Sequence, residues 1–203
     1  MNHVFLKGVI QDISYSHTIG DVEYYKSGIV VRNSNGKQSI LNLQFKKFSC
    51  NVKEGDVVSL VGNIRSYSQK ISEDKNKVNI YVFTYFDTPA EEYEGVENQV
   101  WLDGRICKIE PLRKLENGKC NIHFILANNI EQGNNKLNSY IPCIAWGKLA
   151  KKISELEKDS RIEVVGEIRS REYKKPLGNG EFEIRVAHEL VIMDFYKEGL
   201  DEG

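Results

Sequence analysis

The stretch VFLKGVI at residues 4–10 returns as VWLDGRI at residues 100–106, and LVGNIRS at 60–66 returns as VVGEIRS at 164–170. Both pairs occur in the same order along the chain, 96 and 104 residues apart. Two ordered matches indicate two copies of one domain. The chain has 203 residues, which suits two domains of about 100 residues each.

The repeats place one copy at residues 1–87 and the other at residues 98–196, separated by residues 88–97 and followed by a short tail at 197–203. The segment 88–97 begins with a Thr-Pro pair and carries four glutamates without periodicity, which is typical of a linker. The first copy has 11 basic and 8 acidic residues and the second has 16 and 14, whereas the whole chain has a net charge of −1. Any binding of nucleic acid would therefore use a local patch and depend weakly on salt.

Each copy shows the period-two alternation of β-strands, and Asn-Ser-Asn-Gly at 33–36 is a strong hairpin-turn signal. The expected strands are 4–10, 27–32, 38–45, 57–64, 78–84, 100–109, 120–128, 139–146, 161–168 and 181–193. One stretch, 148–156, has clear helical spacing. Five strands with a helix or turn between the third and fourth, in about 90 residues, are typical of an OB fold. The sequence thus predicts an all-β protein of two tandem OB-fold five-stranded Greek-key barrels, each with a short helix or turn between strands 3 and 4.

Several classes of function lack the residues that they need. The four cysteines, Cys50, Cys107, Cys120 and Cys143, form no CxxC pair, so we expect free thiols, with a Cys107–Cys143 bridge as the alternative, and no zinc site. A hydrolase or a nuclease would need a cluster of acidic residues or an activated Ser or Cys, and the sequence shows neither. We therefore expect neither an enzyme nor a cofactor. No apolar run resembles a signal peptide or a membrane span, and we expect a cytoplasmic, nucleoid-associated protein.

Aromatic and basic residues are interleaved in both copies, as base stacking and phosphate contacts require. In the second copy, residues 169–175 read Arg-Ser-Arg-Glu-Tyr-Lys-Lys. The first copy offers five candidates for contact with nucleic acid: Tyr24, Lys26, Lys46, Arg65 and Tyr67.

The second copy also contains an ordered series of longer motifs. They are NQVWLDGRI at 98–106, FILA at 124–127, YIPCIAWGKLA at 140–150, VGEIRSREY at 165–173 and EIRV at 183–186. This series resembles the bacterial single-stranded DNA-binding protein family in a tandem OB-fold form, with primosomal replication protein N as a close second resemblance. The first copy is a diverged version that is connected to the family through the internal repeat.

The resemblance implies that single strands stack on exposed rings of the barrel. Three rings occupy the places of the family's stacking residues: Tyr140, Trp146 and Tyr173. Five basic residues fall on or beside the matching segments: Arg105, Arg113, Lys148, Arg169 and Arg171. Trp146 is in phase with Ile144 along its strand, so a place in the core is the alternative for this ring. The family's further Trp, after the second strand, has no aromatic counterpart between residues 128 and 139.

We therefore predict a non-enzymatic protein that binds single-stranded DNA without sequence specificity, in replication, recombination or repair. By analogy with the family, two chains would form a homodimer of four barrels, with replication or repair proteins as further partners. The alternative is a primosome-like assembly factor in which one OB domain does not bind DNA. Single-stranded RNA stays open as a ligand, because stacking alone does not distinguish RNA from DNA.

Overall fold

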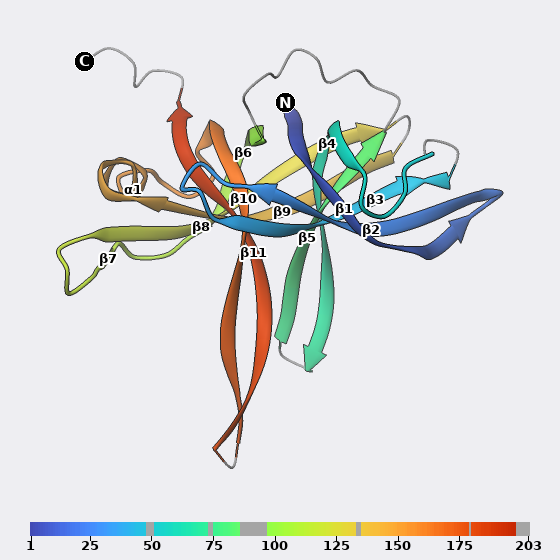
Figure 1. Ribbon diagram of the computed structural model, residues 1–203. Coiled ribbons are helices and arrows are strands. Elements are labelled where there is room, and N and C mark those ends of the chain that lie inside the picture. The colour runs from blue at the N-terminus through green and yellow to red at the C-terminus, as the bar shows by residue number, and fades with distance from the viewer. Residues whose placement is uncertain (48–50, 73–74, 86–96, 133–134, 179, 198–203) are drawn as a thin grey trace.

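A computed structural model of the chain describes residues 1–47, 51–72, 75–85, 97–132, 135–178 and 180–197. Within these ranges, eleven strands form one hydrogen-bonded sheet that closes on itself twice (Figure 1). We call the part built from β1–β5 domain 1 and the part built from β6–β11 domain 2.

The strands of domain 1 are β1 (Asn2–Ile19), β2 (Val22–Arg32), β3 (Gln38–Lys46), β4 (Val57–Ser72) and β5 (Lys75–Tyr85). Domain 2 consists of β6 (Asn98–Ile109), β7 (Arg113–Lys114), β8 (Cys120–Gln132), β9 (Asn135–Trp146), α1 (Gly147–Ser154), β10 (Arg161–Gly178) and β11 (Glu181–Tyr196). The two-residue strand β7 was not expected from the sequence.

Both domains close into a barrel by the same set of pairings. In domain 1, β1 pairs antiparallel with both β2 and β4, and β3 pairs parallel with β5. In domain 2, β6 pairs antiparallel with both β8 and β10, and β9 pairs parallel with β11. Alternate apolar side chains fill each interior, as the period-two pattern predicted, with Leu6, Ile29 and Leu41 fully buried in domain 1 and Leu102, Leu126 and Ile141 in domain 2.

A glycine in the second motif of each repeat allows two strands to approach closely. A Cβ atom at Gly62 would lie 2.4 Å from the carbonyl oxygen of Phe83, and one at Gly166 would lie 2.3 Å from that of Val191. No side chain tolerates such a distance to a backbone atom, so only glycine fits at these two points of barrel closure. The repetition of this glycine is therefore explained by packing.

The two barrels are joined edge to edge through their first strands. β1 pairs antiparallel with β6, which places His3 opposite Trp101 with their rings 5.7 Å apart. Buried Asn98 reinforces the junction, because its side chain accepts a hydrogen bond from the backbone N–H of Ile168 and donates to the carbonyl of Ile168 and to Oδ1 of Asn33. Asn2 binds β4 and Asn128 in the same manner. The junction is thus approximately symmetric and orders the two domains relative to each other.

Several strands extend well beyond the expected ranges. β1 continues to Ile19, β4 to Ser72 and β10 to Gly178, because the β1–β2, β4–β5 and β10–β11 hairpins project from the barrels as arms (Figure 1). An arm has no core against which to bury one face, so the apolar alternation fades there and the sequence pattern underestimates its length.

The helical prediction at 148–156 corresponds to α1, whose Ala150 and Ile153 are buried, with Leu156 buried just after it. In the connection between β3 and β4 of domain 1, the backbone N–H of Asp56 donates to the carbonyl of Lys53 in a turn, whereas residues 48–50 lie outside the described residues, as do nearly all of the expected linker and tail. Cys107, Cys120 and Cys143 are free thiols, as expected, and burial raises the pKa of Cys107 and of Cys143 above the usual range.

Candidate nucleic-acid interface

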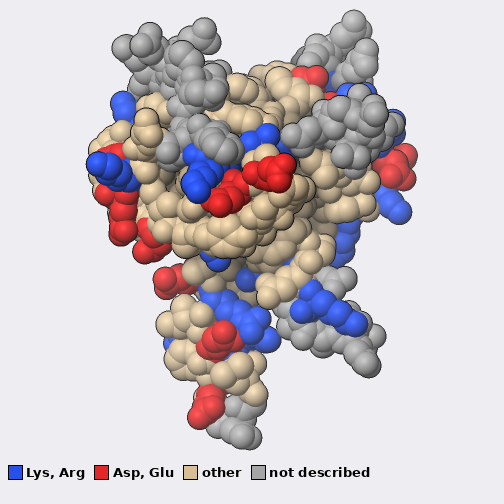
Figure 2. Space-filling view, turned by 90° about the vertical axis from the view of Figure 1, so that its right-hand side faces the viewer, with Lys and Arg blue, Asp and Glu red and all other residues tan. Residues whose placement is uncertain are grey.

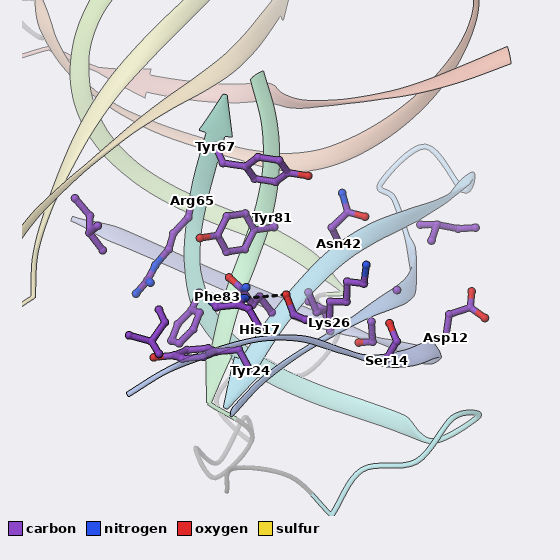
Figure 3. A pocket seen from close by; sticks show the side chains of 18 residues that line it. Asp12, Ser14, His17, Tyr24, Lys26, Asn42, Arg65, Tyr67, Tyr81 and Phe83 are labelled. Carbon is purple, nitrogen blue, oxygen red and sulfur yellow. Dashed lines mark hydrogen bonds between the residues drawn. The ribbon is translucent and has the colours of Figure 1, made fainter. Parts of the chain in front are cut away.

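A groove of about 1080 Å³ runs over domain 1, and we call it the domain 1 groove (Figure 3). Residues from all five strands of the domain line it, together with Leu137 from β9 of domain 2. Five of the lining residues carry rings: His17, Tyr24, Tyr67, Tyr81 and Phe83. The groove therefore combines the ring-rich surface that base stacking needs with a wall contributed by the other domain.

Strand alternation explains why these side chains meet. β2 and β3 pair so that Tyr24 lies opposite Lys46 and Lys26 lies opposite Gln44. The residues between them on β3, such as Phe45, are buried in the barrel interior, so the neighbouring positions face outward. Tyr24 and Lys26 thereby line the groove as predicted candidates, whereas Lys46 lies half-buried at the end of β3 beside it.

The rings of the domain 1 groove form a nearly continuous series. His17 stacks on Tyr24 with ring centroids 4.9 Å apart and planes inclined by only 4°, and Tyr24 lies 6.3 Å from Phe83. Tyr67 and Tyr81 form a second contact at 6.1 Å. Tyr67 is 55% exposed, which leaves its ring open to a ligand. Unpaired bases can stack on such a surface without regard to sequence.

Arg65 connects the rings with the positive charge of the groove. Its guanidinium lies over the ring of Phe83, 4.0 Å from the centroid, and beside Tyr81. Burial raises the pKa of the Tyr81 hydroxyl, and the neighbouring Arg65 opposes part of that rise. The Nε of Arg65 is buried without a hydrogen-bond partner among the described atoms. Arg65 and exposed Lys26 are thus placed to meet a phosphate at a surface that already holds rings.

Domain 2 holds a second, smaller groove of about 570 Å³ around Trp146, which we call the Trp146 groove. Trp146 is 42% exposed, so its ring is not part of the core and the core alternative is wrong. The predicted Lys148 lies in the same groove, together with Lys119 and Lys151. An indole surrounded by three exposed lysines can stack a base and hold its phosphates.

The other predicted rings of domain 2 lie outside the Trp146 groove. Tyr140 is 44% exposed on β9, and its backbone N–H donates to the hydroxyl of Ser66 in domain 1, 2.7 Å away. Tyr173 is half-buried on β10, where the guanidinium of Arg171 lies 5.8 Å from its ring centroid.

Several predicted cations already have acidic or carbonyl partners. Arg169 forms an ion pair with Glu167, which is only 1% exposed, and also donates to Ser34 in domain 1. Arg171 lies 3.7 Å from Glu189, and Arg113 on β7 lies 3.2 Å from Glu110. Arg105 is exposed on β6 and donates to the carbonyl of Asp159. Arg169 therefore acts at the domain junction, where its charge neutralises a buried carboxylate.

A basic cleft lies between the two arms that project from the same side of the molecule. Gln69, Lys70 and Lys77 of the β4–β5 arm face Glu183, Arg185 and Val186 of the β10–β11 arm across about 420 Å³. The arms touch where the ammonium of Lys77 donates to the carbonyl of Val186, 3.3 Å away. Figure 2 shows Lys and Arg side chains gathered where these hairpins leave the body.

Comparison with known proteins now adds to this geometry. Residues 97–194, almost all of domain 2, match the single-strand binding protein family. Domain 2 belongs to this family, whereas domain 1 lies outside the match. Membership of this single-strand binding protein family implies binding of single-stranded DNA, and because proteins of the family are not enzymes, the prediction of a non-enzymatic protein is confirmed.

The whole chain is also similar in fold to solved structures of the single-stranded DNA binding protein from Thermus aquaticus. The wild-type protein aligns with a TM-score of 0.72 at 18% identity, covering 97% of this chain and 92% of that one. A deletion mutant aligns with a TM-score of 0.70 at 19% identity, covering 97% and 94%. No curated protein sequence matches the chain. The predicted all-β fold of tandem OB barrels is thereby confirmed for this single-strand binding family member.

Sequence reasoning missed three ring residues of the domain 1 groove: His17, Tyr81 and Phe83. The signal for two of them was present, because the stretch IYVFTY at 80–85 alternates rings with smaller residues. The alternating apolar residues of this strand predicted only a core face, so the aromatic residues on its other face were not recognised as candidates. Among the described residues, no helix is long and apolar enough to cross a bilayer.

Proposed function

We propose that this member of the single-strand binding protein family coats single-stranded DNA without sequence specificity, with bases stacked in the domain 1 groove and phosphates held by Lys26 and Arg65. One observation carries this proposal: four rings that reach the surface of one groove lie beside two cations, with the buried ring of Phe83 beneath the guanidinium of Arg65. Each stacked base contributes about 1–3 kcal/mol, and every base has a π face, so binding tolerates any sequence.

Domain 2 adds contacts to the same strand in this proposal. Trp146 stacks a base while Lys148 holds a phosphate, supported by Lys119 and Lys151 in the same groove. Tyr140 and Tyr173 supply further stacking surfaces, and exposed Arg105, Arg113 and Arg171 add positive charge at the periphery. The basic cleft between the arms offers additional phosphate contacts near both domains.

The cellular role that fits this activity is protection of unpaired strands in the cytoplasm during replication, recombination or repair, with proteins of these processes as partners. A homodimer of four barrels would suit the coating role. The sheet face opposite the cores supports such a dimer, because half-buried Val61, Trp101 and Val165 lie together there along paired strands. A sedimentation mass near one chain would contradict the dimer.

The test is a titration of fluorescently labelled oligo-dT of increasing length at two salt concentrations. We expect saturable, length-dependent binding that is weakened, but not abolished, at the higher salt. A Tyr24→Ala/Tyr67→Ala variant should bind less tightly, whereas Tyr15→Ala should not, because Tyr15 packs against Tyr25 and is not a lining residue of the groove. Competition with unlabelled duplex DNA and oligo-rU reports the preference for DNA single strands.

The second candidate, an assembly factor in which one OB domain does not bind DNA, is favoured by the ion pairs that occupy Arg169 and Arg171 in domain 2. The titration distinguishes the candidates. Absence of binding to dT of any length at low salt would refute the coating role, whereas binding that does not tighten with dT length would favour the assembly role, in which a single OB domain contacts DNA.

A further inference from the structure

The two domains share a fold but do not present the same outer surface. Tyr24 lies opposite the last residue of β3, Lys46, and Asn121 lies opposite the last residue of β9, Trp146. Strand pairing therefore equates Tyr24 of domain 1 with Asn121 of domain 2. The position that holds a groove ring in domain 1 therefore holds a buried amide in domain 2.

The same comparison extends to the last two strands of each barrel. In the strand register, Arg65 lies opposite Tyr81 and Arg169 lies opposite Glu189. Both arginines stand three residues after the repeated glycine. The groove rings Tyr24, Tyr67, Tyr81 and Phe83 thus correspond in domain 2 to Asn121, Arg171, Glu189 and Val191. None of the four domain 2 residues is aromatic.

The chemistry of the two surfaces differs accordingly. Where domain 1 has the contact between Tyr67 and Tyr81, domain 2 has the ion pair between Arg171 and Glu189, with 3.7 Å between the charged atoms. The carboxylate of Glu189 repels phosphate and reduces the charge that Arg171 can offer to it. The exposed rings of domain 2 occupy positions that do not correspond to the groove rings of domain 1. Trp146, for example, lies at the start of α1.

Domain 2 also helps to build the domain 1 groove, through a longer hairpin. In domain 2, Ser139 follows its partner Asn128 by eleven residues, whereas in domain 1 Ser39 follows its partner Val31 by eight. The longer β8–β9 hairpin brings Leu137 to the wall of the domain 1 groove.

We propose that the two domains divide the binding of one strand between them, with the domain 1 groove as the primary site and domain 2 as an extension that engages only strands reaching beyond it. This inference rests on the proposed function. It assigns the principal site to the domain that is more distant in sequence from the single-strand binding protein family.

The chain provides its own reporter for this division. Both of its tryptophans, Trp101 and Trp146, belong to domain 2, and Trp146 is the more exposed one. Quenching of tryptophan emission therefore reports engagement of domain 2, whereas the anisotropy of a labelled oligonucleotide reports binding anywhere on the protein. A Trp146→Phe variant identifies the part of the quenching that arises at Trp146.

The experiment compares dT oligonucleotides of about 8 and about 30 nucleotides, chosen because one OB fold covers about 4–16. With wild-type protein, the short oligonucleotide should saturate the anisotropy signal with little quenching, and the long one should quench Trp146. Tyr24→Ala/Tyr67→Ala should weaken binding of the short oligonucleotide by roughly 30-fold or more, because two stacking rings are lost. Trp146→Ala/Tyr173→Ala should weaken binding of the long oligonucleotide by a larger factor than binding of the short one.

Two results would overturn the division of labour while leaving the proposed function intact. One is full quenching of Trp146 by the short oligonucleotide at the same affinity that anisotropy reports. The other is loss of short-oligonucleotide binding in the Trp146→Ala/Tyr173→Ala variant but not in Tyr24→Ala/Tyr67→Ala. Absence of binding by wild-type protein at either length would refute the proposed function itself. The wild-type quenching comparison needs no variant, so a folding defect in either double variant cannot obscure the answer.

Discussion

Lys26 and Arg65 supply the positive charge of the domain 1 groove, so their removal should change how binding depends on salt. Each cation that neutralises one phosphate of a single strand contributes about 0.7 to the slope of log K against log salt concentration. Lys26→Ala should therefore lower the slope by about 0.7, and Lys26→Ala/Arg65→Ala by about 1.4. Tyr24→Ala should leave the slope unchanged and weaken binding by about 1–3 kcal/mol at every salt concentration.

The assay is fluorescence anisotropy with a short labelled dT oligonucleotide at four or more salt concentrations. Arg65→Lys is the matched control for charge, because it keeps the cation but loses the planar guanidinium over the Phe83 ring. Lys53→Ala is the control for an exposed lysine that is not a lining residue of the groove. A wild-type slope in Lys26→Ala/Arg65→Ala would refute the assignment of phosphate contacts to these residues. An equal change of slope in Tyr24→Ala would refute the separation of stacking from charge.

Three further predictions concern the framework that positions the grooves. Gly166→Ala should destabilise the protein by roughly 1–3 kcal/mol in urea unfolding, because its Cβ would meet the backbone of Val191, and an unchanged midpoint would contradict this packing role. Asn98→Ala should cost roughly 2–4 kcal/mol, since it leaves the buried N–H and carbonyl of Ile168 without partners, and a loss below 1 kcal/mol would show that water replaces the amide. Burial lowers the pKa of His188, although its hydrogen bond to a carbonyl of domain 1 partly offsets this. The unfolded chain therefore takes up a proton first, and stability should fall as pH drops below about 6.5. Urea midpoints across this range should fall less steeply in His188→Gln, and equal slopes would contradict the assignment.

Much of the site could be read from the sequence as individual residues but not as a set. Tyr24, Lys26, Arg65 and Tyr67 were candidates on the basis of residue type, and they line one groove. Arg169 was a candidate of the same kind, yet its guanidinium pairs with buried Glu167 at the domain junction. Residue type cannot reveal this difference, because the partner is found by packing rather than by spacing.

By itself, the sequence determined the number of domains, their β-barrel class and the absence of the residue clusters typical of hydrolases. These properties follow from the order of residues along the chain. The period of two indicates strands, and an internal repeat indicates two copies of one domain. It also determined which domain is more similar to the family, because that similarity is a property of the chain alone.

Only the tertiary structure decided where the principal groove lies. His17, Tyr24, Tyr81 and Phe83 come from three strands that are separated by up to 66 residues in the chain, and pairing across the barrel brings them onto one face. A wall from domain 2, contributed by Leu137, completes that groove. Contacts between residues so far apart depend on register and barrel closure, and the local pattern of a sequence does not encode either.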